Sequence, residues 1–95
     1  MQFSFIVGAQ EKHQVDFSFD QTIGNLEIRI DGQPAIKDFR LLSLSLTKRY
    51  EFIVGINERH QVAIEKKRKL FLAGFRPMRY RIFIDGQLAQ TYEGI

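Results

Sequence analysis

Apolar and polar residues alternate one by one along most of this chain, a period that is typical of β-strands rather than helices. A strand places successive side chains on opposite faces of a sheet, so strict alternation predicts one buried face and one face in water. Antiparallel sheets have this property, and we therefore expect about seven to nine antiparallel strands. The alternating runs lie at residues 3–7, 13–20, 25–31, 42–47, 50–56, 62–64, 80–84 and 88–92.

The chain contains an internal repeat. Residues 3–16 and 50–63, which are 47 positions apart, share eight identical residues out of fourteen. A second matching pair, residues 28–33 and 82–87, follows in the same order at an offset of 54. Two copies are too few for a solenoid, but two units that each bury one face against the other form a sandwich. We therefore predict one all-β antiparallel sandwich domain over residues 1–95, built from half-units 3–49 and 50–95.

Turn-forming residues separate the runs. Asp31-Gly32 and Asp85-Gly86 are typical of type I′ hairpins, which need positive φ at both central positions. A glycine also closes the first run of each half, at Gly8 and Gly55. Proline has no N–H to donate, so Pro34 and Pro77 are expected at a strand edge, a strand start or a bulge.

The composition indicates a small folded domain. Ninety-five residues suffice for one core, and an apolar fraction of 44% with nine Phe argues against disorder. The chain has no cysteine, which excludes disulfides and Cys-based metal sites and makes a reduced, cytoplasmic compartment the default expectation. No run approaches the roughly 20 apolar residues of a membrane span, and we expect no signal peptide.

The stretch from His13 to Gly94 resembles one domain of the Fas apoptotic inhibitory molecule family. The matching segments, in order, are HQVDFSF, LEIRIDGQPAIKDF, YEFIVG, HQVAIE and RYRIFIDGQLAQTYEG. The resemblance implies a compact antiparallel β-sandwich that is intracellular, has no catalytic residues and acts by binding other proteins. Members of that family in animals are linked to survival signalling and to protection against protein aggregation.

Basic residues are concentrated in the second half. Residues 59–81 hold eight Lys and Arg against one Glu, a net charge of +7, whereas the remaining residues carry −4. Such a field attracts anions, including nucleic acid or an acidic protein segment. The alternative is a solvated turn with edge charges that prevent sheets from aggregating, and we favour it. The candidate anion patch consists of Arg59, Lys66, Lys67, Arg68, Lys69, Arg76, Arg79 and Arg81.

Residues 65–72 have a composition that would suit a short helix. The corresponding segment of the first half is a strand and a turn, so we expect the same here. Lys66–Lys69 would then lie at a hairpin tip.

The two histidines, His13 and His60, occupy equivalent positions of the repeat. A shared metal site would need further ligands, but there is no Cys and no acid at ligand spacing. Structural histidines at strand starts are favoured, because duplication alone explains their pairing. We find no nucleophile elbow, no paired catalytic carboxylates and no phosphate-binding loop. We therefore expect no enzyme activity, no metal and no cofactor.

A few apolar residues fall on the face that should be polar. Ile6 and Ile53 are equivalent in the repeat, and Leu41 and Phe83 behave likewise. If Ile6, Ile53 and Phe83 fall on neighbouring strands, they form a patch for a partner or a dimer. The alternative, equally weighted, is a central strand that is covered on both faces.

Three functions remain open at this level. We favour a protein-interaction module, with a protein partner or self-association. The alternative from another class is binding of an anion or single-stranded nucleic acid through residues 59–81, which salt would weaken steeply. Sugar binding on a sheet face is a third hypothesis that rests on the architecture alone.

Overall fold

A computed structural model describes residues 1–20, 25–39, 47–68 and 78–94, and these ranges form eight antiparallel strands. The sequence-based prediction of an all-β sandwich with seven to nine strands is confirmed. No helix occurs in the described ranges, and hence none that could cross a membrane. The strands are β1 (Gln2–Val7), β2 (His13–Asp20), β3 (Asn25–Ile30), β4 (Gln33–Phe39), β5 (Thr47–Val54), β6 (His60–Arg68), β7 (Met78–Ile84) and β8 (Gln87–Gly94).

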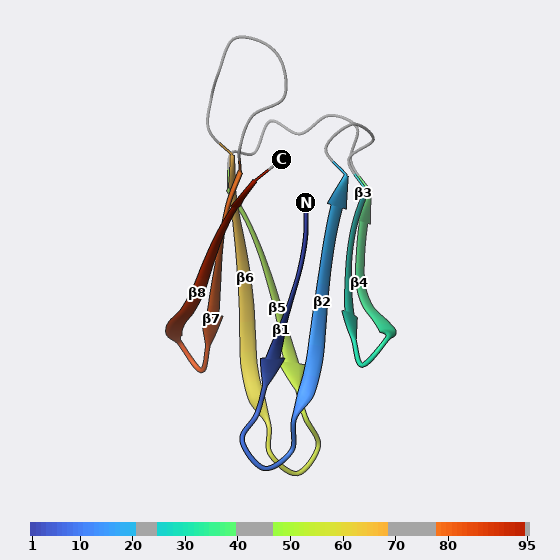
Figure 1. The fold of residues 1–95 in the computed structure, drawn as a ribbon, viewed down its shortest axis with the longest axis vertical. Coiled ribbons are helices and arrows are strands. Elements are labelled where there is room, and N and C mark those ends of the chain that lie inside the picture. The colour runs from blue at the N-terminus through green and yellow to red at the C-terminus, as the bar shows by residue number, and fades with distance from the viewer. Residues whose placement is uncertain (21–24, 40–46, 69–77, 95) are drawn as a thin grey trace, which may run out of the picture.

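Each half of the repeat forms its own four-stranded sheet. Sheet A has the order β1-β2-β3-β4 and sheet B the order β5-β6-β7-β8, so each sheet is a simple meander. The repeat is therefore structural, since β1 corresponds to β5, β2 to β6 and β3 to β7. The molecule is elongated, 46 × 24 × 18 Å, and the loops that follow β1 and β5 lie at the same end (Figure 1).

The core lies between the inner faces of the two sheets. Tyr80 of sheet B is fully buried, and its ring meets Phe17 of sheet A edge-on at 5.0 Å between centroids. Phe3 stacks on Tyr92 of sheet B at 4.2 Å and on Phe17 of its own sheet at 4.6 Å. These aromatic contacts cross from one half to the other, so burial of this apolar surface joins the halves. The buried apolar set is Phe3, Phe5, Val7, Val15, Phe17, Phe19, Leu26, Ile28, Tyr50, Val54, Val62, Ile64, Met78, Tyr80 and Ile82.

The predicted hairpin turns are confirmed. Asp31 and Asp85 have φ of 51° and 52°, and the glycines that follow them have φ of 80° and 82°. Both hairpins have a register shift next to the turn, and Pro34 pairs with Arg29 at the shift in sheet A. Because β4 is an edge strand, the missing N–H of Pro34 is tolerated there, as expected.

The strand limits correct two expectations. Lys66–Lys69 were expected at a hairpin tip, but β6 continues through Arg68, and Lys66 and Lys67 pair with Tyr80 and Arg79 of β7. Strand β4 was not recognised in advance, because Gln33–Phe39 does not alternate clearly. Within the run expected at 42–47, β5 begins at Thr47. The rest of that run and Pro77 lie outside the described residues.

Candidate functional site

The loop after β1 and the loop after β5 both begin at a glycine that no other residue could replace without strain. Gly8 and Gly55 have φ of 109° and 104°. A Cβ atom on Gly8 would lie 2.0 Å from the carbonyl oxygen of Glu11, and one on Gly55 would lie 2.0 Å from that of Glu58. Each glycine thus allows the chain to fold back tightly, which directs the following N–H groups to one side.

These N–H groups bind a carboxylate of the other half. The Glu58 side chain accepts hydrogen bonds from the backbone N–H groups of Ala9, Gln10 and Glu11 at 2.7, 2.7 and 3.2 Å. Consecutive N–H groups that converge on one point form a natural anion site. In this molecule the anion is supplied by the chain itself, from a residue 47 to 49 positions away.

The arrangement is reciprocal. The Glu11 carboxylate accepts from the N–H groups of Ile56 and Asn57 at 2.6 and 2.9 Å. We call the two exchanged glutamates, with the loop N–H groups that they bind, the clasp. Figure 1 shows the two loops side by side at the lower end of the molecule. The clasp therefore ties sheet A to sheet B at this end.

Each histidine supports the glutamate of its own half. The ring of His13 lies between two carboxylates, with Nε2 2.6 Å from Glu11 Oε2 and Nδ1 2.5 Å from Asp31 Oδ2. His60 repeats this contact with Glu58 at 2.5 Å and Asp85 at 2.6 Å. Both ring nitrogens face an acceptor, so the protonated imidazolium, which donates from both nitrogens, is the form that satisfies both carboxylates.

The hairpin aspartates complete the arrangement. Asp31 also accepts from the backbone N–H of Gln14 at 2.9 Å, and Asp85 accepts from that of Gln61 at 3.0 Å. Each Asp-Gly turn therefore forms the hairpin, and its aspartate side chain also binds Nδ1 of the histidine. The glutamate, the histidine and the Asp-Gly pair, which are identical in both halves, therefore make equivalent contacts in each half.

The clasp shifts the protonation of all its members. The pKa of Glu11 is lowered from 4.5 to about 2, first by its hydrogen bond to His13 and then by the loop N–H groups of the other half. Glu58 has the same shift, to about 2, for the equivalent reasons. Hydrogen bonds to Asp31 and then Glu11 raise the pKa of His13 above 6.5. The glutamates are therefore ionised over the whole physiological range.

This geometry suits a structural role better than a chemical one. Both nitrogens of each ring are engaged by carboxylates, so neither histidine offers a lone pair to a metal or to a substrate proton. His13 and His60 bind separate carboxylates and do not share a ligand set. In the described ranges, no group of three or more His, Asp or Glu side chains could hold a metal ion.

The residues of the predicted anion patch do not form one surface. Arg59 lies in the loop before β6 and donates to the carbonyl of Ile56. Lys67 is near the other end of that strand, about 25 Å away at the usual rise per residue. Lys66 points inward, with its ammonium 3.9 Å from the ring centroid of Phe19. Lys69, Arg76 and the side chain of Arg68 lie outside the described part of the chain.

Three of the eight basic residues share the outer face of sheet B. Lys67 and Arg79 are register partners on β6 and β7, and Arg81 follows two residues later. Arg81 is hydrogen-bonded to Glu65, and Arg49 of β5 approaches the same carboxylate at 3.8 Å. Ion pairs thus offset part of the positive charge on this face.

The three apolar residues predicted to form a patch lie apart. Ile6 is on the outer face of sheet A and Ile53 on the outer face of sheet B, with 55% and 56% of each exposed. Phe83 is half-buried, and the guanidinium groups of Arg49 and Arg81 lie 5.2 and 5.8 Å from its ring. The single patch is therefore wrong, because equivalent residues of the two halves belong to opposite sheets. The covered central strand is wrong for Ile6 and Ile53 too, since β1 and β5 are edge strands.

The structure adds two exposed apolar residues that sequence reasoning missed, Ile56 and Leu88, and the first lies near the clasp. Ile56 lies in the loop after β5 and is 76% exposed. Ile6 and Ile53 each lie two residues before the glycine that opens a loop of the clasp. We call Ile6, Ile53 and Ile56 the isoleucine rim. The only sequence signal for Ile56 was its place directly after Gly55, the glycine that closes the first run of the second half. Leu41 lies outside the described residues.

Comparisons with known proteins found no matching family model, no matching curated protein and no matching solved structure.

Proposed function

We propose that this protein is a non-enzymatic interaction module that contacts other proteins through the isoleucine rim, with Ile6 on the outer face of sheet A and Ile53 on that of sheet B acting as two separate contacts. The observation that carries the proposal is the exposure of Ile6 and Ile53, at 55% and 56%. Every other apolar residue that is identical in both halves is buried or half-buried, with its side chain on the inner face. Neither isoleucine contributes to the core, so packing gives no reason for its presence in both halves.

The clasp holds the loops next to the isoleucine rim in a fixed conformation, which favours binding. Ile56 is itself a member of the clasp, because its N–H donates to Glu11. The loops that carry or adjoin the rim are therefore held in one conformation before a partner arrives. A preorganised surface loses less conformational entropy on binding, which strengthens even a small contact. The resemblance to the Fas apoptotic inhibitory molecule family agrees with this proposal, because that family acts by binding proteins.

Cross-linking and pull-down experiments with a double variant test the proposal. Ile6→Ser with Ile53→Ser should keep the fold, because exposed substitutions usually change the free energy of unfolding by less than about 0.5 kcal/mol. We expect cross-linked or captured species of the wild type to disappear in this variant. The control is Leu88→Ser, which alters an equally exposed residue, 55%, at the opposite edge of sheet B. A wild type that is strictly monomeric and captures nothing contradicts the proposal.

A second candidate function is binding of single-stranded nucleic acid on the outer face of sheet B. Its support is the cluster of Arg49 and Arg81 around the half-buried ring of Phe83, with Lys67 and Arg79 on the same face. Guanidinium groups beside an aromatic ring are suited to phosphates and stacked bases. Binding should weaken steeply as salt rises, and the absence of any oligonucleotide shift at low salt contradicts it.

A further inference from the structure

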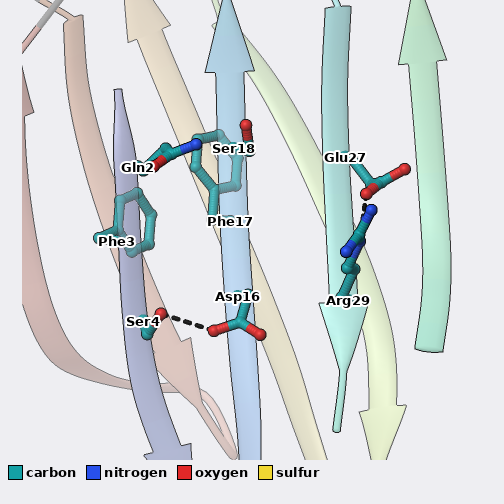
Figure 2. A pocket seen from close by; sticks show the side chains of 8 residues that line it. All are labelled: Gln2, Phe3, Ser4, Asp16, Phe17, Ser18, Glu27 and Arg29. Carbon is teal, nitrogen blue, oxygen red and sulfur yellow. Dashed lines mark hydrogen bonds and ion pairs between the residues drawn. The ribbon is translucent and has the colours of Figure 1, made fainter. Parts of the chain in front are cut away.

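The outer face of sheet A contains a shallow polar hollow that neither the clasp nor the isoleucine rim involves. It lies over β1, β2 and β3 and encloses about 350 Å³. Figure 2 shows its walls, with Ser4 and Asp16 hydrogen-bonded to each other across β1 and β2, and with Glu27 and Arg29 paired on β3. The complete lining is Gln2, Phe3, Ser4, Asp16, Phe17, Ser18, Glu27 and Arg29.

The two halves differ in side-chain size on their outer faces, and this difference accounts for the hollow. Ser4 and Ser18 are small, whereas the equivalent residues of sheet B are Glu51 and Glu65. Arg29 corresponds to Phe83, whose ring and overlying guanidinium groups cover that part of sheet B. Inner-face positions differ as well, such as Phe19 against Lys66 and Leu26 against Tyr80, but those side chains do not line this surface. The small side chains of Ser4 and Ser18 therefore leave a concave surface on sheet A.

A preset hydrogen-bond acceptor lies in the hollow. Asp16 Oδ1 accepts from the Ser4 hydroxyl at 2.6 Å and from the Gln14 side-chain amide at 2.8 Å. These bonds, that to Gln14 first, lower the pKa of Asp16, so its carboxylate is ionised at neutral pH. Both neighbours bind the same oxygen, which leaves Oδ2 to accept from a ligand. The guanidinium of Arg29 and the hydroxyl of Ser18 supply donors around it.

These groups select a class of ligand. Two carboxylates against one guanidinium make the hollow slightly negative, which disfavours anions. Its exposed groups are polar, which disfavours apolar molecules. The guanidinium of Arg29 at the same surface disfavours a cation. A neutral molecule with adjacent hydroxyl groups fits best, because its hydroxyls can donate to Asp16 and accept from Arg29. We propose that this hollow binds one neutral sugar ring of a glycan, independently of the protein-interaction function proposed above. Shallow walls and the lack of an exposed aromatic ring make the expected affinity millimolar.

Amide chemical shifts of the 95-residue chain test this proposal. The probes are the methyl glycosides of glucose, galactose and mannose, each added to about 50 mM, well above a millimolar dissociation constant. We expect saturable shifts at the amides around Ser4, Asp16 and Arg29, with the clasp amides unaffected. Urea at equal concentration is the solute control and should give no saturable shift.

Two variants locate the binding site. Asp16→Ala should abolish the saturable shifts. The clasp amides of this variant should keep their wild-type chemical shifts, which shows that the variant is folded. Glu51→Gln, which changes the residue equivalent to Ser4 on the other sheet, should leave the shifts intact. The proposal is overturned if none of the three glycosides gives a saturable shift, or if the shifts persist in Asp16→Ala.

Discussion

Gly8 and Gly55 are the residues on which the clasp depends most directly. Their φ values lie in the left-handed region, and their neighbouring carbonyl oxygens leave no room for a Cβ atom. A side chain at either position would have to reshape the loop that presents the N–H groups. Gly32 offers a matched comparison, because it has φ of 80° but nothing within 4 Å of its would-be Cβ.

We predict that Gly8→Ala lowers the free energy of unfolding by about 3 kcal/mol or more, since it combines backbone strain with a steric clash. Gly32→Ala should cost only the strain, about 1–2 kcal/mol. Urea unfolding of the two variants measures both values. Equal losses would show that the close approach at Gly8 has no energetic consequence.

The sequence indicated these residues without indicating their role. The repeat marked Glu11, His13 and Gly8 as equivalent to residues 47 positions later, and the histidines expected at strand starts do begin β2 and β6. Alternation and turn chemistry describe contacts between neighbours in the chain. The exchange of glutamates between halves depends on how the two sheets meet, which no local pattern records.

At the scale of the elements, the two loops behave as one titrating unit. The carboxylates of Glu11 and Glu58 stabilise the fold only when ionised, and His13 and His60 only when protonated. The glutamate contribution is fully present above their unfolded pKa of 4.5 and is lost as pH falls towards about 2. The histidine contribution is fully present below 6.5 and is lost as pH rises through the raised pKa.

We therefore predict that stability is greatest between about pH 4.5 and 6.5 and declines on both sides. Melting temperatures measured within this pH range and on both sides of it give the dependence of stability on pH. His13→Gln with His60→Gln should remove the decline on the alkaline side and reduce the acid one without abolishing it, because the loop N–H groups still bind the glutamates. A wild-type melting temperature that rises steadily from pH 5 to pH 8 would be incompatible with a charged imidazolium in the clasp.

Most strands were predictable because one face of each is buried and the other is wet. Strand β4 was missed, since Pro34 and a register shift interrupt its alternation at the sheet edge. The basic run after Glu65 was assigned to a turn because the equivalent segment of the first half was interpreted as a strand and a turn. Lys66 is tolerated in the strand because its ammonium lies over the ring of Phe19 and its stem covers apolar surface.

For the whole molecule, aromatic packing between the sheets is the main link besides the clasp. Tyr80 is fully buried and contacts Phe3 and Phe17 of the other half at 5.6 and 5.0 Å between ring centroids. Its hydroxyl donates only a weak bond, to the Met78 sulfur at 3.7 Å. Tyr80 therefore stabilises the fold through the apolar area that its ring buries and not through a hydrogen bond.

We predict that Tyr80→Ala lowers the free energy of unfolding by about 3–5 kcal/mol, as expected for loss of a large buried ring. Tyr80→Phe should change it by less than about 1 kcal/mol, because only the weak bond to sulfur is lost. Denaturant unfolding followed by tyrosine fluorescence and by circular dichroism measures both variants. The account requires the two signals to coincide, since the halves share one core.

The exchange of glutamates between the halves is tested most directly by amide hydrogen exchange in Glu58→Ala. The substitution lies in sheet B's loop, yet it should speed exchange at Ala9 and Gln10, whose N–H groups lose their acceptor, while Asn57 stays bound to Glu11. Glu11→Ala should give the converse, with faster exchange at Ile56 and Asn57. Acceleration confined to the loop that carries the substitution would contradict the clasp and the joining of the two halves through it.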